Sequence, residues 1–187
     1  MTDAEFRAKL KVFEGYAEHM YLDSVGEVMI GVGLMLPSAQ AAKSASLGFY
    51  DRKSRESAAG EAIEKDFERV RKAPKGMFPP ENYKRYTELA ASAARLKTAL
   101  DRRIRTAKSD AVAFYPQYRQ LPSSVRYALL DMAFNLGRTR LSQYRKLKVA
   151  LQNSEWALAA EQSHRVGIQA VRNRAIADWI RKGARSR

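Results

Sequence analysis

The chain of 187 residues contains no cysteine and only two histidines, His19 and His164. The lack of cysteine excludes disulfides, thiolate metal sites and cysteine nucleophiles, although it does not fix the compartment. Two histidines without His-Glu-x-x-His spacing argue against a histidine-based zinc site. We therefore expect no metal and no cofactor, and both histidines are predicted to be structural or exposed rather than catalytic.

Long apolar runs are also missing. No stretch of about 18 apolar residues occurs, so no membrane-spanning helix is expected. The first residues, Met1-Thr2-Asp3-Ala4-Glu5, show no basic segment followed by an apolar one, so we expect no secretory signal peptide. If the protein works outside the cytoplasm, another carrier must deliver it, or the signal belongs to a longer parent chain.

The charge is strongly one-sided, with 34 basic against 20 acidic residues and a formal net charge of +14. A surface this basic attracts polyanions: nucleic acid, an anionic membrane, or bacterial cell wall. Part of the excess also serves solubility. No helix-turn-helix, zinc-finger or RNA-recognition signature is present, so a nucleic-acid binder is the weakest of these readings and no specific nucleic-acid partner is expected.

The N-terminal third changes from a helical to a strand pattern. Thr2 and Glu5 have the spacing of a capping box, and apolar residues then recur at helical intervals, which predicts a helix over 3–14 that ends before Gly15. Strand-favouring residues around a Ser24-Val25-Gly26 turn predict a β-hairpin over 20–33.

The remainder of the chain is predicted to be mostly helical. A length of 187 residues with 45% hydrophobic content fits one domain, or one domain with a small lobe. Proline and glycine interrupt the helical pattern over 73–80, which marks a loop. Expected helical stretches are a short helix within 37–57, then 57–72, 81–114, 122–137, 140–152, 154–165 and 173–182. The fold class is α+β, mostly α.

Glu14 and Asp23 are the candidate catalytic pair. One is predicted to end a helix and the other to lie at the adjoining hairpin turn, so the two acids can have different environments across a cleft. Glycosidic-bond hydrolysis needs one carboxyl that donates a proton and one that stays ionised. The non-catalytic alternative is an ordinary helix-end glutamate and an ordinary turn aspartate.

Three segments resemble phage-type lysozymes (glycoside hydrolase family 24). The first is the pattern Phe13-Glu14-Gly15, Tyr21-Leu22-Asp23-Ser24-Val25-Gly26 and Ile30-Gly31-Val32-Gly33, which resembles the family's active-site helix and hairpin. The stretch from Val125 to Gly137 is similar to its central core helix, and Asn173-Arg174 through Trp179 is a weaker match. The amino-acid sequences of residues 19–23 and 35–39 are similar to those of lysozyme domains in type VI secretion effectors.

The resemblance implies a lysozyme-like two-lobed fold with a small β-hairpin lobe and a helical core lobe joined by a long helix. It implies a single domain over 1–187: the active-site helix and hairpin over 1–36, a variable region over 37–120 and the core lobe over 121–187. The implied activity is hydrolysis of the β-1,4 bond between N-acetylmuramic acid and N-acetylglucosamine. The implied roles are Glu14 as general acid, Asp23 as the water-activating carboxylate, Arg174 as ion-pair partner of Glu14, and Met35, Phe134 and Asn135 as cleft residues.

Met29 departs from the family pattern. The family has a threonine there, whose hydroxyl helps to hold the nucleophilic water, and a thioether accepts hydrogen bonds only weakly and donates none. Leu34 is a second departure, where many members carry histidine. Two alternatives stay open: an active muramidase, or a weakened or inactive lysozyme-fold module that binds cell wall or perturbs membranes.

The resemblance also implies the partners and the place of action. These are peptidoglycan glycan strands at the cell wall, in the periplasm or the envelope of a target cell. Delivery is expected through a secretion system, a holin or a parent protein, with a cognate immunity protein or secretion machinery as further partners. We expect a monomer, either an endolysin or the toxin domain of an effector.

Overall fold

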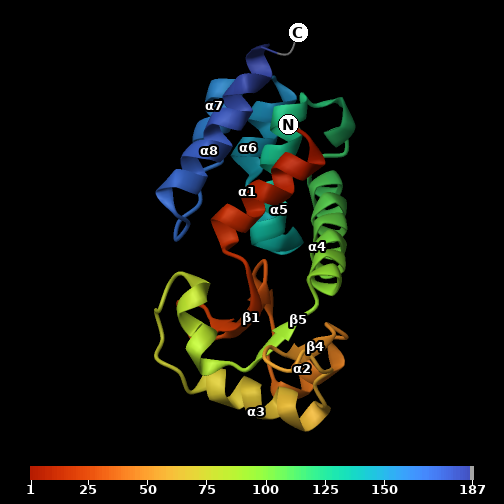
Figure 1. Ribbon diagram of the computed structural model, residues 1–187. Helices are drawn as coiled ribbons and strands as arrows, with labels where there is room; N and C mark the ends of the chain where they lie inside the picture. The colour runs from red at the N-terminus through yellow and green to blue at the C-terminus, as the bar shows by residue number, and fades with distance from the viewer. Residues whose placement is uncertain (186–187) are drawn as a thin grey trace. The chain divides into compact units, whose positions relative to one another are not determined.

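The computed structural model describes residues 1–185 and has an α+β fold that is mostly helical (Figure 1). Helices account for 61% of the residues and strands for 10%, so the predicted fold class is confirmed at this level. The chain divides into two compact units. Unit 1 comprises Met1–Arg7 and Arg102–Arg187, and unit 2 comprises Ala8–Asp101. The boundaries fall inside two helices, α1 (Asp3–Glu14) and α4 (Ala93–Phe114).

Unit 2 contains both small sheets. An antiparallel sheet with strand order β1-β2-β3 is formed by Ala17–Leu22, Val28–Gly31 and Leu34–Met35. A second antiparallel pair joins β4 (Phe49–Asp51) to β5 (Leu89–Ala91). The predicted hairpin over 20–33 is confirmed in its turn and strands, and it begins earlier, at Ala17, and gains the third strand β3.

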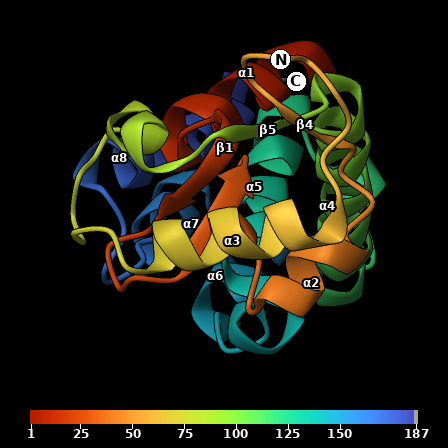
Figure 2. The same cartoon turned by 60° about the horizontal axis from the view of Figure 1, so that its bottom comes forward.

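Helices α2 (Ala39–Ser44) and α3 (Gly60–Arg71) pack against each other in unit 2, as Figure 2 shows, and α3 also contacts β1 and β2. Between them, the sheets and helices bury an apolar core that includes Met20, Ile30 and Val70, each without solvent exposure. Burial of side chains of this size stabilises the folded state by about 1.5–3 kcal/mol each. The hairpin strands are therefore held by a core, not by strand pairing alone.

The predicted helix over 81–114 is wrong in its first part. A 3₁₀ helix, η1 (Pro80–Tyr86), and strand β5 precede α4, which starts only at Ala93. Leu89, Ala90 and Ala91 are all buried and pair with β4, and the buried Thr87 hydroxyl donates to Asp66. Strand pairing and burial on both faces override the helical spacing of the apolar residues. A short apolar run in the sequence does not by itself distinguish a buried strand from a buried helix.

Unit 1 is helical. Its central helix α5 (Ser123–Leu141) follows Pro122, as predicted, and buries one face and much of the rest, including Leu129 and Met132. Gly137 has a left-handed backbone (φ 67°) and interrupts α5, which resumes to Leu141 rather than ending at the glycine. The other elements are η2 (Tyr118–Gln120), α6 (Arg145–Gln152), α7 (Trp156–Gln162), α8 (Ala170–Arg181) and η3 (Lys182–Arg185). Residues 186 and 187 of the predicted core region lie outside the described residues.

The start of the chain is anchored within unit 1. The predicted capping box is present: the Thr2 backbone N–H donates to Glu5 Oε2 (2.7 Å), and the Glu5 N–H donates to Thr2 Oγ1 (3.2 Å). On the next turn, the Phe6 ring lies 5.3 Å from that of Tyr127, whose hydroxyl donates to Asp3 Oδ1 (2.6 Å). Helix α1 thus begins at a fixed point on α5.

Candidate functional site

Glu14 is the last residue of α1 and is half-buried. The chain turns immediately after it, because Gly15 has a positive φ of 76° that L-residues adopt only with strain. A Cβ at this position would lie 3.0 Å from Pro80 Cγ of η1, so there is little room for a side chain. Backbone conformation and close packing together fix where the helix ends and the direction in which β1 leaves it.

Asp23 organises the hairpin turn. Its Oδ1 atom accepts backbone N–H bonds from Val25 (2.9 Å), Gly26 (2.8 Å) and Glu27 (2.9 Å). The Asp23 N–H donates to the Glu27 carbonyl (3.0 Å) and closes the turn. Among residues 1–185, none donates to Oδ2 of this half-buried carboxylate. One carboxylate oxygen therefore holds the turn, and the other is available for a water molecule.

A bulge in β1 shortens the path from Glu14 to Asp23. Ala17 pairs with Gly31 and Tyr21 pairs with Met29, so four residue steps on β1 face two on β2. In regular strands, with a rise of about 3.3 Å per residue, four steps would span about 13 Å, whereas the two facing steps on β2 span about 7 Å. This geometry lies wholly within unit 2, and it places the turn carboxylate nearer to the end of α1 than a fully extended nine-residue segment would.

Met29 lies in the middle of an apolar row across the sheet. It pairs with Tyr21 on β1 and with Met35 on β3, so the three side chains share one face. Tyr21 is buried, Met29 is half-buried against the unit 2 core, and Met35 is 51% exposed. The row thus runs from the core to the surface, and Met29 contributes to packing at the position where the lysozymes that the sequence resembles have a threonine.

His19 is buried, and its Nε2–H donates to the Pro80 carbonyl (3.0 Å). Burial lowers the pKa of this imidazole from its ordinary value of 6.5, and the cations Arg52 and Lys84 lower it further, while the Pro80 bond and Glu81 oppose them. The side chain fastens β1 to η1 in its neutral form.

The free energy of unfolding is expected to fall as the pH drops below about 6.5. The folded state holds the His19 proton less tightly than the unfolded state, so stability is complete above the unfolded pKa and is lost as the pH falls from it towards the folded pKa. Urea titrations between pH 8 and pH 5 would show a shallower decline for His19→Gln, with the exposed His164→Gln as control. Burial raises the pKa of Asp66, which acts in the opposite sense at lower pH, so the difference between variants is the measure.

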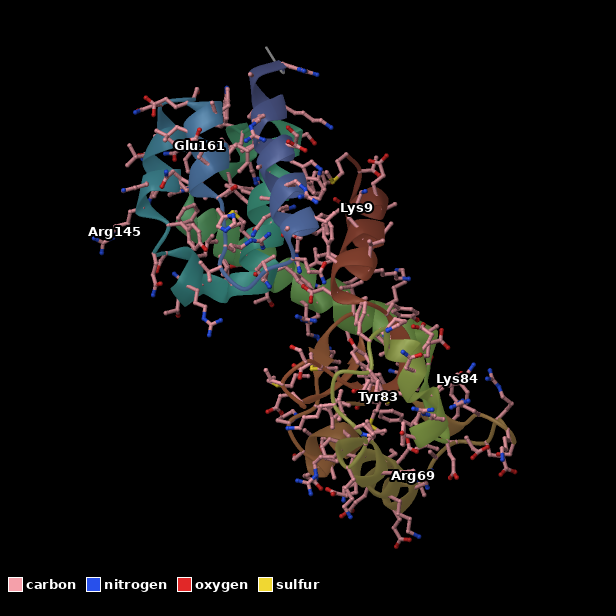
Figure 3. All side chains as sticks on the ribbon, turned by 90° about the vertical axis from the view of Figure 1, so that its left-hand side faces the viewer. Lys9, Arg69, Tyr83, Lys84, Arg145 and Glu161 are labelled. Atoms are coloured by element: carbon pink, nitrogen blue, oxygen red, sulfur yellow. The ribbon has the colours of Figure 1, made fainter. Side chains whose placement is uncertain are left out.

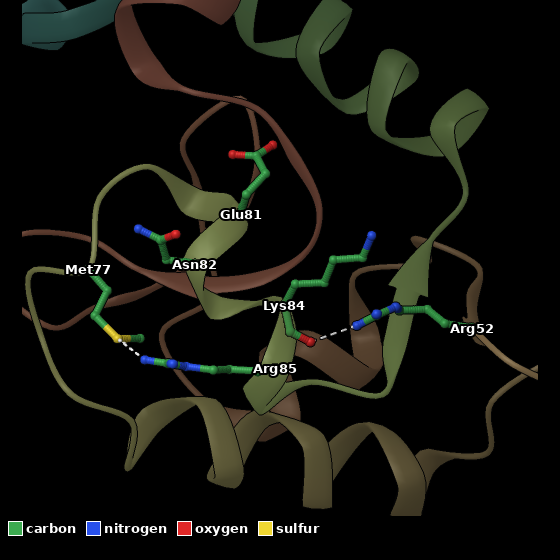
Figure 4. A pocket seen from close by; sticks show the side chains of 6 residues that line it. All are labelled: Arg52, Met77, Glu81, Asn82, Lys84 and Arg85. Atoms are coloured by element: carbon green, nitrogen blue, oxygen red, sulfur yellow. Dashed lines mark hydrogen bonds between the residues drawn. The ribbon is translucent and has the colours of Figure 1, made fainter.

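A basic hollow of about 710 Å³ lies beside η1 in unit 2 (Figure 4). Arg52 donates to the carbonyls of Lys84 (2.8 Å) and Thr87 (2.7 Å), and Arg85 contacts the Met77 sulfur (3.4 Å). The hollow is lined by Arg52, Met77, Glu81, Asn82, Lys84 and Arg85. Neither Glu14 nor Asp23 lines it, so this hollow is not the candidate catalytic site, and sequence reasoning did not find it.

The remaining predicted site residues lie in unit 1. Phe134 and Asn135 are on α5, just before the interruption at Gly137, and the Arg103 guanidinium lies 4.3 Å from the centre of the Phe134 ring. Arg174 is exposed on α8, where it lines a hollow of about 290 Å³ together with His164. Within unit 2, the structure groups Met29 with Met35; within unit 1, Phe134 and Asn135 are neighbours.

A buried ionic cluster in unit 1 was not predicted. Asp131 on α5 is fully buried and binds two arginines. Arg172 reaches it with Nη2 at 2.9 Å from Oδ1 and with Nε, and Arg165 reaches it with Nη1 at 3.0 Å from Oδ2. Both arginines are also buried. The sequence signal was Asp131 itself, a single acid within the most apolar helix, which requires a buried partner.

No family model matches the chain, and no curated protein matches its sequence. In the part of the chain that the structure describes, no helix has both the length and the apolarity needed to cross a membrane. Among residues 1–185, no three acidic or histidine side chains are grouped so that they could hold a metal ion. The lysozyme resemblance therefore rests on the sequence motifs alone.

Proposed function

We propose that this chain is a peptidoglycan muramidase with the lysozyme-like two-lobed fold. The observation that carries the proposal is the bulged hairpin of unit 2, which follows directly from Glu14 and shortens the path to Asp23. Its agreement with the helix, hairpin and glycine motifs supports the family, and the interrupted helix α5 agrees with the second motif. Arg174 remains a proposed partner of Glu14, and Met35, Phe134 and Asn135 remain proposed cleft residues.

The proposed reaction uses the two carboxyl groups in opposite protonation states. Glu14 donates its proton to the bridging oxygen as the bond from C1 of N-acetylmuramic acid to that oxygen breaks. A water molecule adds to C1, and its proton passes to Oδ2 of Asp23, the oxygen that the turn leaves available. The products are two shorter glycan strands, one with a new reducing end.

The uneven charge distribution supports a cell-wall substrate. Unit 1 carries 19 basic and 7 acidic residues, a net charge of +12, whereas unit 2 carries 15 and 13, a net charge of +2. No acidic residue occurs between Asp131 and Glu155, a stretch with five cations, and Figure 3 shows one of them, Arg145, extending away from the ribbon at the start of α6. A surface of this sign attracts the anionic wall polymers. Delivery by a secretion system, a holin or a parent protein, and an immunity partner, belong to the same proposal.

The test is digestion of purified peptidoglycan followed by borohydride reduction and mass spectrometry of the fragments. A muramidase creates reducing ends on N-acetylmuramic acid, so reduced muramic acid is the expected product. Reduced glucosamine at the new ends would identify a glucosaminidase instead. If the folded protein releases no reducing ends from walls that a reference muramidase digests, the proposal is wrong.

Asp23→Asn is expected to lower kcat by about 10²-fold, at the lower end of the range for loss of a general base. The expected cause is loss of the carboxylate charge, because an asparagine Oδ1 can still accept the three turn N–H bonds. A thermal melt distinguishes the two roles of Asp23. An unchanged Tm with lost activity assigns a catalytic role, whereas full activity leaves Asp23 as a turn residue only.

A second candidate is a weakened or inactive lysozyme-fold module. The observation in its favour is the packing of Met29 between Tyr21 and Met35, where a thioether accepts hydrogen bonds only weakly and donates none. We expect Met29→Thr to raise kcat about two- to tenfold, the equivalent of one hydrogen bond of about 0.5–1.5 kcal/mol. Met29→Val is the matched control, because valine has nearly the same shape as threonine but no hydroxyl. Equal effects of the two substitutions would show that space, not hydrogen bonding, is limiting.

A further inference from the structure

Arg165 contacts one of the proposed cleft residues directly. Its Nη1 donates to Asn135 Oδ1 (3.3 Å) and also contacts Asp131 Oδ2 (3.0 Å). The guanidinium is only 1% exposed, so both contacts are shielded from water. Because arginine has only donors, the amide atom that faces it must be the oxygen of Asn135.

The backbone of Arg165 is fixed as well. Its carbonyl accepts from Asn173 Nδ2 (2.8 Å), and its N–H donates to Asn173 Oδ1 (3.3 Å). Asn173 is on α8, so this reciprocal pair ties the loop before α8 to the helix. Asp131 then holds the guanidinium against α5 from the other end. The orientation of Arg165 is therefore set at both its backbone and its side chain.

The arrangement is energetically costly. Arg165 Nε and Nη2 are buried without a hydrogen-bond partner among the described residues, and a buried donor of this kind loses its hydration without gaining a hydrogen bond. Arg165 also shares the Asp131 carboxylate with Arg172. A shorter apolar side chain would avoid the cost of the unmet donors, so the stability of unit 1 alone does not account for an arginine at this position.

The Asn135 amide group is left accessible on its other side. Asn135 is half-buried. None of residues 1–185 accepts a hydrogen bond from its Nδ2 atom, and this atom is not among the fully buried polar atoms that lack a partner. With Oδ1 held by Arg165, the two N–H donors of Nδ2 can meet only solvent or a ligand. The ligand group that fits them is a carbonyl oxygen, such as that of the acetamido group on an N-acetylated sugar.

We propose that Arg165, anchored by Asp131, is a positioning residue that orients the Asn135 carboxamide to donate to the acetamido oxygen of the glycan. This proposal rests on the proposed function for the identity of the ligand. The orientation itself belongs to the folded chain and can be measured without any substrate.

The first experiment is NMR of the free protein. The Asn135 side-chain N–H₂ pair, assigned by its disappearance in Asn135→Asp, is expected to shift and to gain mobility in Arg165→Met. Arg165→Lys, which keeps one donor, should retain most of the wild-type signal, and Arg181→Met on the surface of α8 is the control. An unaltered Asn135 pair in folded Arg165→Met would overturn the positioning role whatever the enzyme does. If Arg165→Met does not fold, the folded Arg165→Lys variant decides the question. Side-chain N–H₂ signals of Asn135 like those of the wild type would support the proposal, and signals that show increased mobility would overturn it.

The second experiment uses soluble glycan strands released from peptidoglycan by an amidase. Asn135→Asp keeps the contact with Arg165 but removes the donor, so KM should rise about three- to tenfold with little change in kcat. The double variant Arg165→Met/Asn135→Asp should match Asn135→Asp alone, because Arg165 acts through Asn135. Additive effects on KM would reduce Arg165 to a structural residue. Complete inactivity of the wild type would show that the proposed function is wrong. The NMR result on the orientation of the Asn135 amide would not be affected.

Discussion

Glu14→Gln is expected to lower kcat on peptidoglycan by about 10²–10⁴-fold, the usual contribution of a general acid. The amide is nearly the same size as the carboxyl group, so α1 should still end at residue 14 and the Gly15 turn should persist. KM should change little, because the proton is needed only in the transition state. Initial rates of reducing-end release, measured at saturating substrate, give the comparison.

Glu27→Gln is the matched control for this substitution. Glu27 is an exposed glutamate in the hairpin that follows α1, and among the described residues it takes part in the turn through its backbone N–H and carbonyl only. Its amide variant should retain wild-type activity. Equal losses in the two variants would point to general charge effects, and full activity of Glu14→Gln would remove the proposed acid from the mechanism.

Asp131→Asn is expected to destabilise the protein by about 3–5 kcal/mol, the range for breaking a buried ion pair by removing one partner. The substitution conserves volume but leaves Arg165 and Arg172 buried without their shared counter-charge. Native proteins have a free energy of unfolding of about 5–15 kcal/mol, so the expected loss is a large fraction of the total stability. Guanidinium chloride unfolding followed by circular dichroism gives the free-energy difference.

Asp178→Asn provides the contrast on the surface. Asp178 pairs with Arg181 at 3.0 Å, but both side chains are more than half exposed, and exposed pairs contribute about 0–1 kcal/mol. The surface variant should therefore unfold within about 0.5 kcal/mol of the wild type. If Asp131→Asn were as mild as Asp178→Asn, the two buried arginines would not depend on Asp131 for their counter-charge.

The sequence predicted features that depend on neighbouring residues. The capping box of Thr2 and Glu5, the stop at Gly15 and the turn after Asp23 all follow from local backbone chemistry, and all three are present. The start of α5 after Pro122 belongs to the same class. Features of this kind need no knowledge of the rest of the fold.

Features that depend on distant pairing were missed. The segment Leu89–Ala91 lies within the stretch 81–114 that was predicted to be helical, but it becomes a strand because Phe49–Asp51 lies beside it. The partners of Asp131 are 34 and 41 positions away, so no local pattern marks Arg165 or Arg172. The two-residue bulge in β1 likewise depends on the register with β2, which the hairpin turn alone does not set.

The most direct test of the central claim is a crystal structure of the Glu14→Gln variant with a bound glycan strand released from peptidoglycan. We expect the glycosidic oxygen to lie within hydrogen-bond distance of the residue 14 amide, and C1 to face a water molecule bound to Asp23 Oδ2. The two carboxyl positions should be about 6.5–9.5 Å apart, the separation of inverting glycosidases. A glycan bound away from both residues, or residues 14 and 23 directed to different faces of unit 2, would contradict the account.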